Sequence, residues 1–322
     1  MKARKLIPAF ALLLSLTALT ACTGDKTVEF GNYWTGDALI SSTDIHEILE
    51  YDVTFQPTKI TDSLDYQPAY SNGSLVTTLN STTENGQVVY IFTTEMHVDV
   101  TYTFNGVSTD PLKDSVVSEV RFYEAANNLK PISSSKTIVA HNPLNGNNHS
   151  KLSECYLPVN YTINTTYNEN GKGKCVVTSE SNAGFNFTDT FSPDKDYTFI
   201  DNEQLLVALR AFDDDTTSAT LESYSPFAGN TQKIKYTFAE GKSGQKFDLV
   251  ENGQNYTGDN ARAINYREVT MSIDASNSGP AQTALVATGN TSTFRNVVLQ
   301  LETQHAYGLG SLVFKLKTIT RS

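Results

Sequence analysis

The sequence is poor in positive charge. It has 24 lysine and arginine residues against 35 aspartate and glutamate residues, a formal net charge of −11. Three of these cations lie before residue 6, so a chain without its N-terminus is more acidic still. A surface this acidic repels phosphate backbones, so nucleic acid is not expected as a partner. The same balance predicts no basic patch for anionic lipid head groups, and it keeps an exposed protein soluble.

Apolar runs long enough to span a membrane are missing. The run 7–19 is apolar apart from Pro8, Ser15 and Thr17. At about 13 residues it is shorter than the roughly 20 that a spanning helix needs. The cations at positions 2, 4 and 5 precede it, and a charged head followed by a short apolar run is typical of a secretory signal peptide.

The signal ends in Leu19-Thr20-Ala21-Cys22, which resembles the lipobox of bacterial lipoproteins. In that family the cysteine thiol receives a diacylglycerol, the chain is cleaved before the cysteine, and the new amine is open to acylation. The resemblance implies that residues 1–21 are a signal peptide and that Cys22 carries the lipid anchor. Two acyl chains hold a protein on a membrane stably. The alternative is an ordinary cleaved signal in which Cys22 has no role.

The lipobox resemblance implies an extracytoplasmic protein anchored to a bacterial cell membrane, a plasma membrane in preference to an outer membrane. Residues 22–43 hold the lipidated cysteine and a polar stretch rich in Gly, Ser and Thr, which is typical of a flexible tether. Residues 44–322 show no further linker and no internal repeat. We therefore expect them to form one β-rich domain.

Cysteine is scarce, with Cys155 and Cys175 the only cysteines besides Cys22. Outside the cytoplasm a disulfide between them is one alternative. However, Asn170-Gly171 predicts a hairpin turn, which would place Cys175 opposite residues near 165. Cys155 would then lie about ten residues away, roughly 30 Å along the strand and beyond disulfide reach. Two buried free thiols are the other alternative.

Alternating apolar and polar residues predict a mainly β fold. The clearest stretch, 88–104, puts residues such as Tyr90, Phe92 and Phe104 on one face and ends at Asn105-Gly106, a hairpin signal. It would be roughly 56 Å long if straight, so it must coil strongly or contain a bulge, as in a barrel or half-barrel. Other expected strands cover 49–55, 75–79, 219–223, 233–239, 269–273, 281–287, 293–302 and 312–318.

One helix is expected. Asp201 is a good N-cap, and Gln204 three residues later completes a capping-box pattern. Residues 205–212 are apolar except for Arg210, and a helix that is apolar nearly all round is buried. Acids oppose the dipole at a helix C-terminus, so we expect 213–215, three aspartates, in a solvated loop. The predicted fold is a large curled antiparallel sheet, a half-barrel, wrapping this helix.

Three stretches, Val120–Pro143, Phe199–Phe212 and Phe294–Ile319, are similar in their order to exported bacterial proteins of the half-barrel class that includes the LolA/LolB lipoprotein carriers. In that class a long antiparallel sheet curls round a helix and leaves an apolar groove. The shared features here are Leu129-Lys130-Pro131 and the segment Leu206–Arg210. The resemblance implies a groove and brings no catalytic residues with it.

No catalytic motif is present, because Gly-x-Ser-x-Gly, a Walker loop and a dinucleotide fingerprint are all missing. We therefore expect neither an enzyme activity nor a cofactor. Glu95, His97 and Asp99 alternate on one face and are ligand types that suit zinc. We favour the simpler interpretation that they form the solvated face of a strand, and we expect no metal.

Other reactive side chains have simpler explanations. His141 and His149 flank a loop rich in Gly and Asn, and are expected in exposed turns. The spacing of aspartates 213–215 matches no calcium loop. Ser134 and Ser135 lack an identifiable histidine and acid partner, and Cys155 and Cys175 are not expected to act as nucleophiles.

Two classes of function remain. The first is binding of a lipid or another hydrophobic molecule in the half-barrel groove. The second is a surface interaction or structural role, in which exposed Tyr, Asn and Thr bind protein or glycan. A helix that fills the sheet completely would remove the groove and leave a dry core. The residues predicted to line the groove are Leu205, Leu206, Leu209, Phe212, Tyr90, Phe92 and Phe104.

Overall fold

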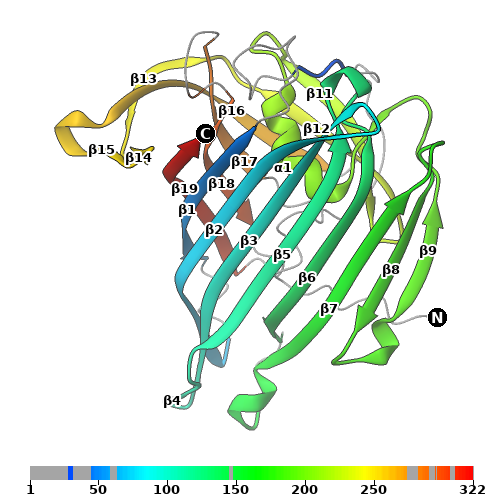
Figure 1. Ribbon diagram of the computed structural model, residues 1–322. Coiled ribbons are helices and arrows are strands. Elements are labelled where there is room, and N and C mark those ends of the chain that lie inside the picture. Colours follow the sequence, from blue (N-terminus) through cyan, green and yellow to red (C-terminus); the bar gives the residue numbers. More distant parts are fainter. Residues whose placement is uncertain are drawn as a thin grey trace.

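The computed structural model describes residues 28–31, 45–58, 64–144, 148–273, 282–289, 294, 296–304 and 309–321. These residues form one sheet of 19 strands, which is not closed, around a short helix. The prediction of a mainly β, curled sheet is therefore confirmed (Figure 1). The predicted signal peptide 1–21 and Cys22 lie outside the described residues.

The strands are β1 (His46–Pro57), β2 (Tyr66–Glu84), β3 (Gln87–Phe104), β4 (Val107–Ser108), β5 (Leu112–Tyr123), β6 (Pro131–Pro143), β7 (Tyr156–Tyr167), β8 (Gly173–Ser179), β9 (Phe187–Phe191), β10 (Thr198–Phe199), β11 (Ser218–Ser225), β12 (Asn230–Phe238), β13 (Lys242–Phe247), β14 (Leu249–Glu251), β15 (Gln254–Tyr256), β16 (Arg262–Ile273), β17 (Gln282–Ala287), β18 (Val298–Gln304) and β19 (Gly310–Arg321). The helix α1 (Leu205–Ala208) lies between 3₁₀ turns at Asn202–Gln204 and Leu209–Ala211.

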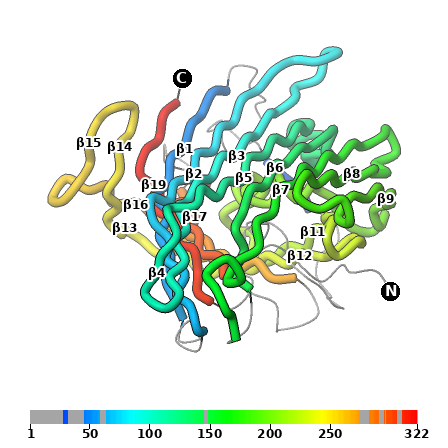
Figure 2. Tube along the Cα trace, turned by 90° about the horizontal axis from the view of Figure 1, so that it is seen from below, coloured from blue at the N-terminus to red at the C-terminus, as the bar shows by residue number. Residues whose placement is uncertain are grey.

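The main path across the sheet runs β9-β8-β7-β6-β5-β3-β2-β1-β19-β18-β17-β16-β12-β11-β10. The pairs are antiparallel except β10–β11 and, off the main path, β14–β19. Figure 2 shows this path curling round until β9 faces β11 and β12. Strands β13 to β15 project from the side beyond β16 and β19.

Side chains close the gap between the two ends of the sheet. The Phe191 ring on β9 stacks on Tyr224 of β11, with ring centroids 3.9 Å apart and an interplanar angle of 3°. The Tyr224 hydroxyl donates a hydrogen bond to Asp189 at 2.9 Å. The Phe199 ring on β10 lies 5.9 Å from that of Phe191. We call this side-chain junction between β9 and β10–β11 the seam.

The long strand expected over 88–104 is β3, which pairs with β2 over nearly its whole length. A bulge interrupts this ladder, because Asn72 and Gly73 together stand opposite one residue of β3. Asn72 has a φ of 51°, and a Cβ on Gly73 would lie 2.5 Å from the Val53 carbonyl oxygen, so only glycine fits there. Such bulges bend a strand and increase its twist, which helps a long sheet to curl.

The Asn-Gly pairs at 85–86, 105–106 and 252–253 make the tight turns that the sequence predicts. Each has both residues at positive φ, as a two-residue hairpin of the right twist requires. On β3 the apolar face predicted from the alternation is buried. Strands β5 to β9, however, lie in a part of the chain where the sequence indicated few separate strands.

The helical segment 201–212 fills the concave side of the sheet. The predicted capping box is formed: the Asp201 carboxylate accepts from the backbone N–H of Glu203, and the Gln204 side chain accepts from that of Asp201. Every residue from Leu205 to Phe212 is buried. The aspartates 213–215 follow in a loop where Asp213 and Asp215 are exposed, as expected.

Arg210, the one polar residue between Leu205 and Phe212, lies in a buried ion pair. Its guanidinium contacts both carboxylate oxygens of Glu47 on β1, and Arg321 on β19 contacts the same carboxylate at 2.7 Å. Arg210 also exchanges hydrogen bonds with Asn296, which donates to the Arg210 carbonyl at 2.9 Å. These contacts join the helix to strands far apart in the sequence.

Part of the predicted tether is packed on the domain. The Val28 N–H donates to the Thr198 hydroxyl at 3.1 Å, and the Gly31 N–H donates to the Ala211 carbonyl at 2.9 Å. The Phe30 and Phe212 rings lie 5.5 Å apart. Residues 28–31 therefore attach to the seam and to the helix. No described helix has the length and apolar character needed to cross a membrane.

The two remaining cysteines are buried and not joined. Cys175 on β8 stands opposite Thr165 on β7, the register that the Asn170-Gly171 turn predicts. Cys155 lies just before β7, about ten residues further along, so a disulfide would need a span of roughly 30 Å. The alternative of two free thiols therefore holds.

The Glu47–Arg210 pair predicts a specific loss of stability. Burial would raise the pKa of Glu47, but the Arg210 and Arg321 guanidiniums outweigh it and hold the pKa below its usual value. Glu47→Gln leaves Arg210 buried without its counter-charge, which costs about 3–5 kcal/mol. In urea unfolding, the difference from the unaltered chain should be largest near neutral pH. It should shrink as the pH falls from about 4.5, the ordinary glutamate value, through the lower pKa of Glu47 in the folded chain, below which the unaltered Glu47 is also neutral.

Asp52→Asn is the matched control. Asp52 lies on β1, as Glu47 does, and pairs with Lys317 of β19 at 3.0 Å, but both groups are exposed. It should cost less than about 1 kcal/mol. Equal effects of the two substitutions would contradict the structural role given to the buried pair.

Candidate ligand-binding clefts at the seam

The side chains predicted to line a groove lie in the packed core. All seven are buried and belong to one continuous apolar cluster. The cavity that adjoins Leu206 has a volume of about 20 Å³, room for a single water molecule. In the described part of the chain the helix therefore fills the hollow of the sheet at this point. The seven side chains predicted to line the groove are those of Leu205, Leu206, Leu209, Phe212, Tyr90, Phe92 and Phe104.

The candidate zinc ligands do not converge. His97 Nε2 lies 2.8 Å from Glu95 Oε1, and both side chains are more than half exposed. Asp99 is instead bound by Lys113 at 2.7 Å and by Asn72 at 2.9 Å. The described residues contain no group of three or more His, Cys, Asp or Glu side chains placed to hold a metal ion.

The two loop histidines each pair with an aspartate. His141 Nδ1 lies 2.6 Å from Asp114, and His149 Nδ1 lies 2.6 Å from Asp65. Both histidines are less exposed than the sequence indicated, because aromatic rings cover them: Tyr156 lies edge-on to His141, and Tyr66 to His149. These two pairs hold β6 and the loop that follows it to the neighbouring segments that carry Asp114 and Asp65.

A buried polar cluster surrounds the start of the helical segment. The Asp201 carboxylate accepts from Ser134 at 2.7 Å and from the Tyr167 hydroxyl at 2.5 Å. Lys136 lies 3.1 Å from Glu203, and both side chains are almost fully buried. Burial raises the pKa of Asp201, and the neighbouring Glu203 adds to the effect. Ser134, considered as a nucleophile from the sequence, instead helps to hold the helix cap.

Tyr167 connects this cluster to the outside. Burial raises the pKa of its phenol well above the usual value, so the hydroxyl stays protonated and donates to Asp201. Its ring contacts those of Phe191 and Phe199 at the seam, at centroid distances of 6.0 and 5.8 Å. One edge of Tyr167 also lines a cleft on the outer surface.

That cleft, which we call the strand cleft, follows from the register of β7, β8 and β9. Tyr167, Gly173 and Phe191 stand in one row across the three strands. The Tyr167 hydroxyl and the Phe191 ring point inward, and the Phe191 ring also occupies the place of a Gly173 side chain, so no side chain of this row covers the outer face. The cleft has a volume of about 420 Å³.

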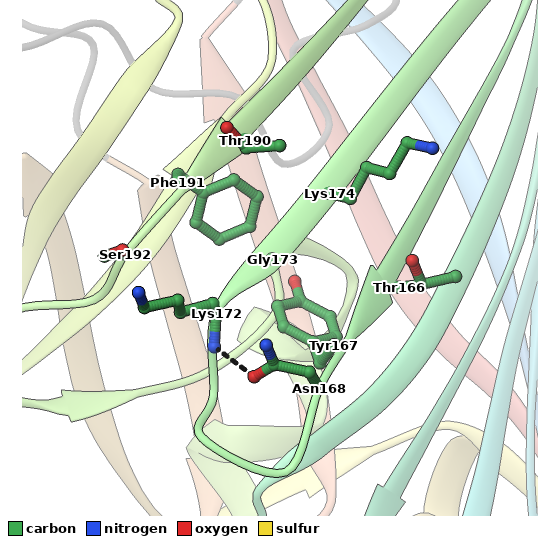
Figure 3. Close-up of a pocket in the computed structure, with 9 residues that line it drawn as sticks. All are labelled: Thr166, Tyr167, Asn168, Lys172, Gly173, Lys174, Thr190, Phe191 and Ser192. Carbon is green, nitrogen blue, oxygen red and sulfur yellow. Dashed lines mark hydrogen bonds between the residues drawn. The ribbon is translucent and has the colours of Figure 1, made fainter.

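The neighbouring rows form the walls of the strand cleft. On one side stand Thr166, Lys174 and Thr190, which pair across the strands, and on the other side are Asn168, Lys172 and Ser192. Figure 3 shows the Phe191 ring beside Gly173, with the Lys172 and Lys174 side chains extending to either side. The Asn168 side chain accepts from the backbone N–H of Lys172 at 3.0 Å, which orders the turn.

A second cleft, the loop cleft, adjoins the first and has a volume of about 440 Å³. It lies where the loop before β6, the turn between β7 and β8, and the loop between β9 and β10 come together. The two clefts share Lys172 and Ser192, and together we call them the seam clefts. The side chains lining the loop cleft include Asn127, Asn128, Lys130, Lys195, Tyr197 and Phe199.

The seam clefts gather positive charge on an acidic protein. Lys130, Lys172, Lys174 and Lys195 line them, and Asp194 is the one lining acid among the described residues. This differs from the expectation of no basic patch, because net charge does not report where charges lie. The pair Lys172 and Lys174 is a visible sequence signal, but Lys130 and Lys195 come from separate segments that only the fold brings near.

Comparison with known proteins adds little. No protein-family model matches the chain, and no curated protein matches it. One solved structure that it is similar to is a beta-barrel-like protein of domain of unknown function DUF1849 from Brucella abortus. The identity is 11% and the TM-score 0.47, over 88% of this chain and 100% of that chain. The LolA/LolB resemblance is not confirmed and stays a prediction.

The close packing of the Phe191 ring on Gly173 predicts that a methyl group there disturbs the seam. A Cβ on Gly173 would lie 2.0 Å from the Phe191 ring, which is itself held against Tyr224. Gly173→Ala should therefore displace the ring and lower the free energy of unfolding by about 1–3 kcal/mol. Gly241→Ala is the control, since its Cβ would meet no atom within 4 Å. Equal stabilities of the two variants in urea unfolding would contradict the packing described.

Proposed function

We propose that this chain is an extracytoplasmic lipoprotein, anchored through Cys22, that binds a ligand in the seam clefts. The observation that carries the proposal is the pair of adjoining clefts on the outside of a barrel whose core beside the helix is filled. Each volume, about 420 and about 440 Å³, lies within the range of small-molecule sites. The proposed role is binding, without a catalytic step.

The lining of the clefts supports this choice. Tyr167 and Phe199 offer partly exposed rings at the seam, while threonine, serine and asparagine side chains stand around them. An apolar floor with a few convergent polar groups is typical of ligand sites. The hypothesis of a hydrophobic ligand thereby moves from the interior to the surface, where it meets the second hypothesis, a surface interaction.

The proposed anchor would hold the clefts near a membrane. Val28 is attached to Thr198, which lines the loop cleft. The six residue steps from Cys22 to Val28 span at most about 20 Å. A lipid on Cys22 would therefore keep the loop cleft within a short distance of the bilayer surface.

The anchor predicts lipid attachment at one residue. In a bacterial host fed labelled palmitate, the full chain should take up label and partition into detergent, because acyl chains would be attached at Cys22. Cys22→Ala should remove both properties. An unlabelled, water-soluble product from the unaltered chain would instead indicate an ordinary cleaved signal.

The binding role predicts that a ligand is retained and can be blocked. The chain from residue 22, with Cys22→Ser, contains every described residue and would be mixed with a bacterial envelope extract. Native mass spectrometry should then show an added mass. Thr190→Trp fills the strand cleft and should remove that mass, whereas Thr178→Trp, exposed on β8 outside the cleft, should keep it. Retention by both variants would contradict binding in the clefts.

A further inference from the structure

We infer that the seam clefts bind a phosphate group, presented by a molecule at the membrane surface. This inference rests on the proposed function and adds the chemical class of the ligand. It follows from the ion-pairing of the lysines that line the clefts, from the charges and hydrogen-bond donors around these lysines, and from the place where the N-terminal segment is attached.

In the part of the chain that the structure describes, the cleft lysines have no acidic partners. Among the described residues, Lys172, Lys174 and Lys195 form no ion pair, and Lys130 donates only to the Glu169 backbone carbonyl at 2.8 Å. Some other lysines do pair with acids, as Lys113 does with Asp99 and Lys317 with Asp52. Positive charge is therefore left available at the clefts, although the protein has an excess of acids.

The nearby acid is already engaged. Asp194 lines the loop cleft, but Lys233 contacts its carboxylate at 3.3 Å and also lies over the Tyr197 ring at 3.7 Å. Exposed acids that lie more than about 8 Å from the clefts act weakly there, because charges at that separation are screened at physiological salt. An anion entering the clefts therefore meets mainly the lysines.

The arrangement suits a phosphate better than a single carboxylate. A phosphate monoester carries about −1.5 to −2 charges on three terminal oxygens, and the phosphodiester of a lipid head group carries about one charge on two terminal oxygens and has two bridging oxygens besides. The strand cleft is lined by Lys172 and Lys174 and by the hydroxyl-bearing residues Thr166, Thr190 and Ser192, so several side chains that can donate hydrogen bonds border one hollow. Lysine binds phosphate as a point charge and does not need the planar geometry of an arginine–carboxylate pair.

The attachment of the N-terminal segment favours a lipid head group as the source of the phosphate. Val28 is bonded to Thr198 in the wall of the loop cleft, so the proposed lipid on Cys22 lies within about 20 Å of it. Lysines near a membrane surface attract anionic lipids at about 1 kcal/mol each. A soluble phosphate ester would satisfy the same chemistry, and the experiment separates the two.

The experiment uses the chain from residue 22 with Cys22→Ser. Its arms are binding to phosphatidylglycerol vesicles and, by isothermal titration, binding of glycerol 3-phosphate and of acetate. The double variant Lys172→Gln and Lys174→Gln should weaken vesicle binding roughly thirtyfold. Lys315→Gln with Lys317→Gln is the control, because these exposed lysines have the same spacing on β19 and remove the same charge. The control should bind as the unaltered chain does.

Loss of vesicle binding in the Lys172→Gln, Lys174→Gln variant alone, together with tighter binding of glycerol 3-phosphate than of acetate, would support the inference. Binding to vesicles but not to glycerol 3-phosphate would assign the phosphate to a lipid head group, and the reverse would assign it to a soluble ester. Equal losses in both double variants would overturn the inference. The inference would also be overturned by a neutral ligand whose binding is blocked by Thr190→Trp but is unchanged in the lysine variants. In that case the proposed function would stand. Failure of every molecule tested, envelope extract included, to bind the clefts would overturn both.

Discussion

The rest of the structure depends on how the concave side of the curled sheet is filled. The segment from Asp201 to Phe212 lies there, entirely buried from Leu205 onward. Buried polar groups hold it at both ends: Asp201 is bound by Ser134 and Tyr167, and Arg210 is bound by Glu47 and Asn296. Polar groups out of water are stable only when they are hydrogen-bonded, and charged ones only when they are also paired, so these contacts specify one position for the helix.

The path of the chain into the barrel explains why the sheet stays open. After β9 the chain crosses to β10, pairs in parallel with β11 for two residues, and then turns inward as the helical segment. A strand that joined β9 to β11 by a backbone ladder would block the path by which the chain enters the interior of the sheet. The seam is therefore joined by the Phe191–Tyr224 stack in place of a backbone ladder. The loops that gather at this opening form the loop cleft, and the adjoining strand ends form the strand cleft.

Features that depend on near neighbours could be predicted from the sequence: the alternation of β3, the Asn-Gly turns, the capping box and the register that separates Cys155 from Cys175. Features that depend on distant contacts could not. The place of Asn72-Gly73 as a bulge depends on the approach of Val53, and the lysines of the seam clefts come from three segments. A filled core and an apolar groove have the same apolar pattern, so the sequence left both open.

The central claim is that a ligand binds outside a filled barrel, at the seam. The most direct measurement is the change in backbone amide NMR shifts when a short-chain phosphatidylglycerol is added to the chain from residue 22 with Cys22→Ser. The account predicts that the shifted amides cluster at residues 166–174 and 190–199. Changes centred on residues 205–212 would place the ligand beside the helix and contradict the account.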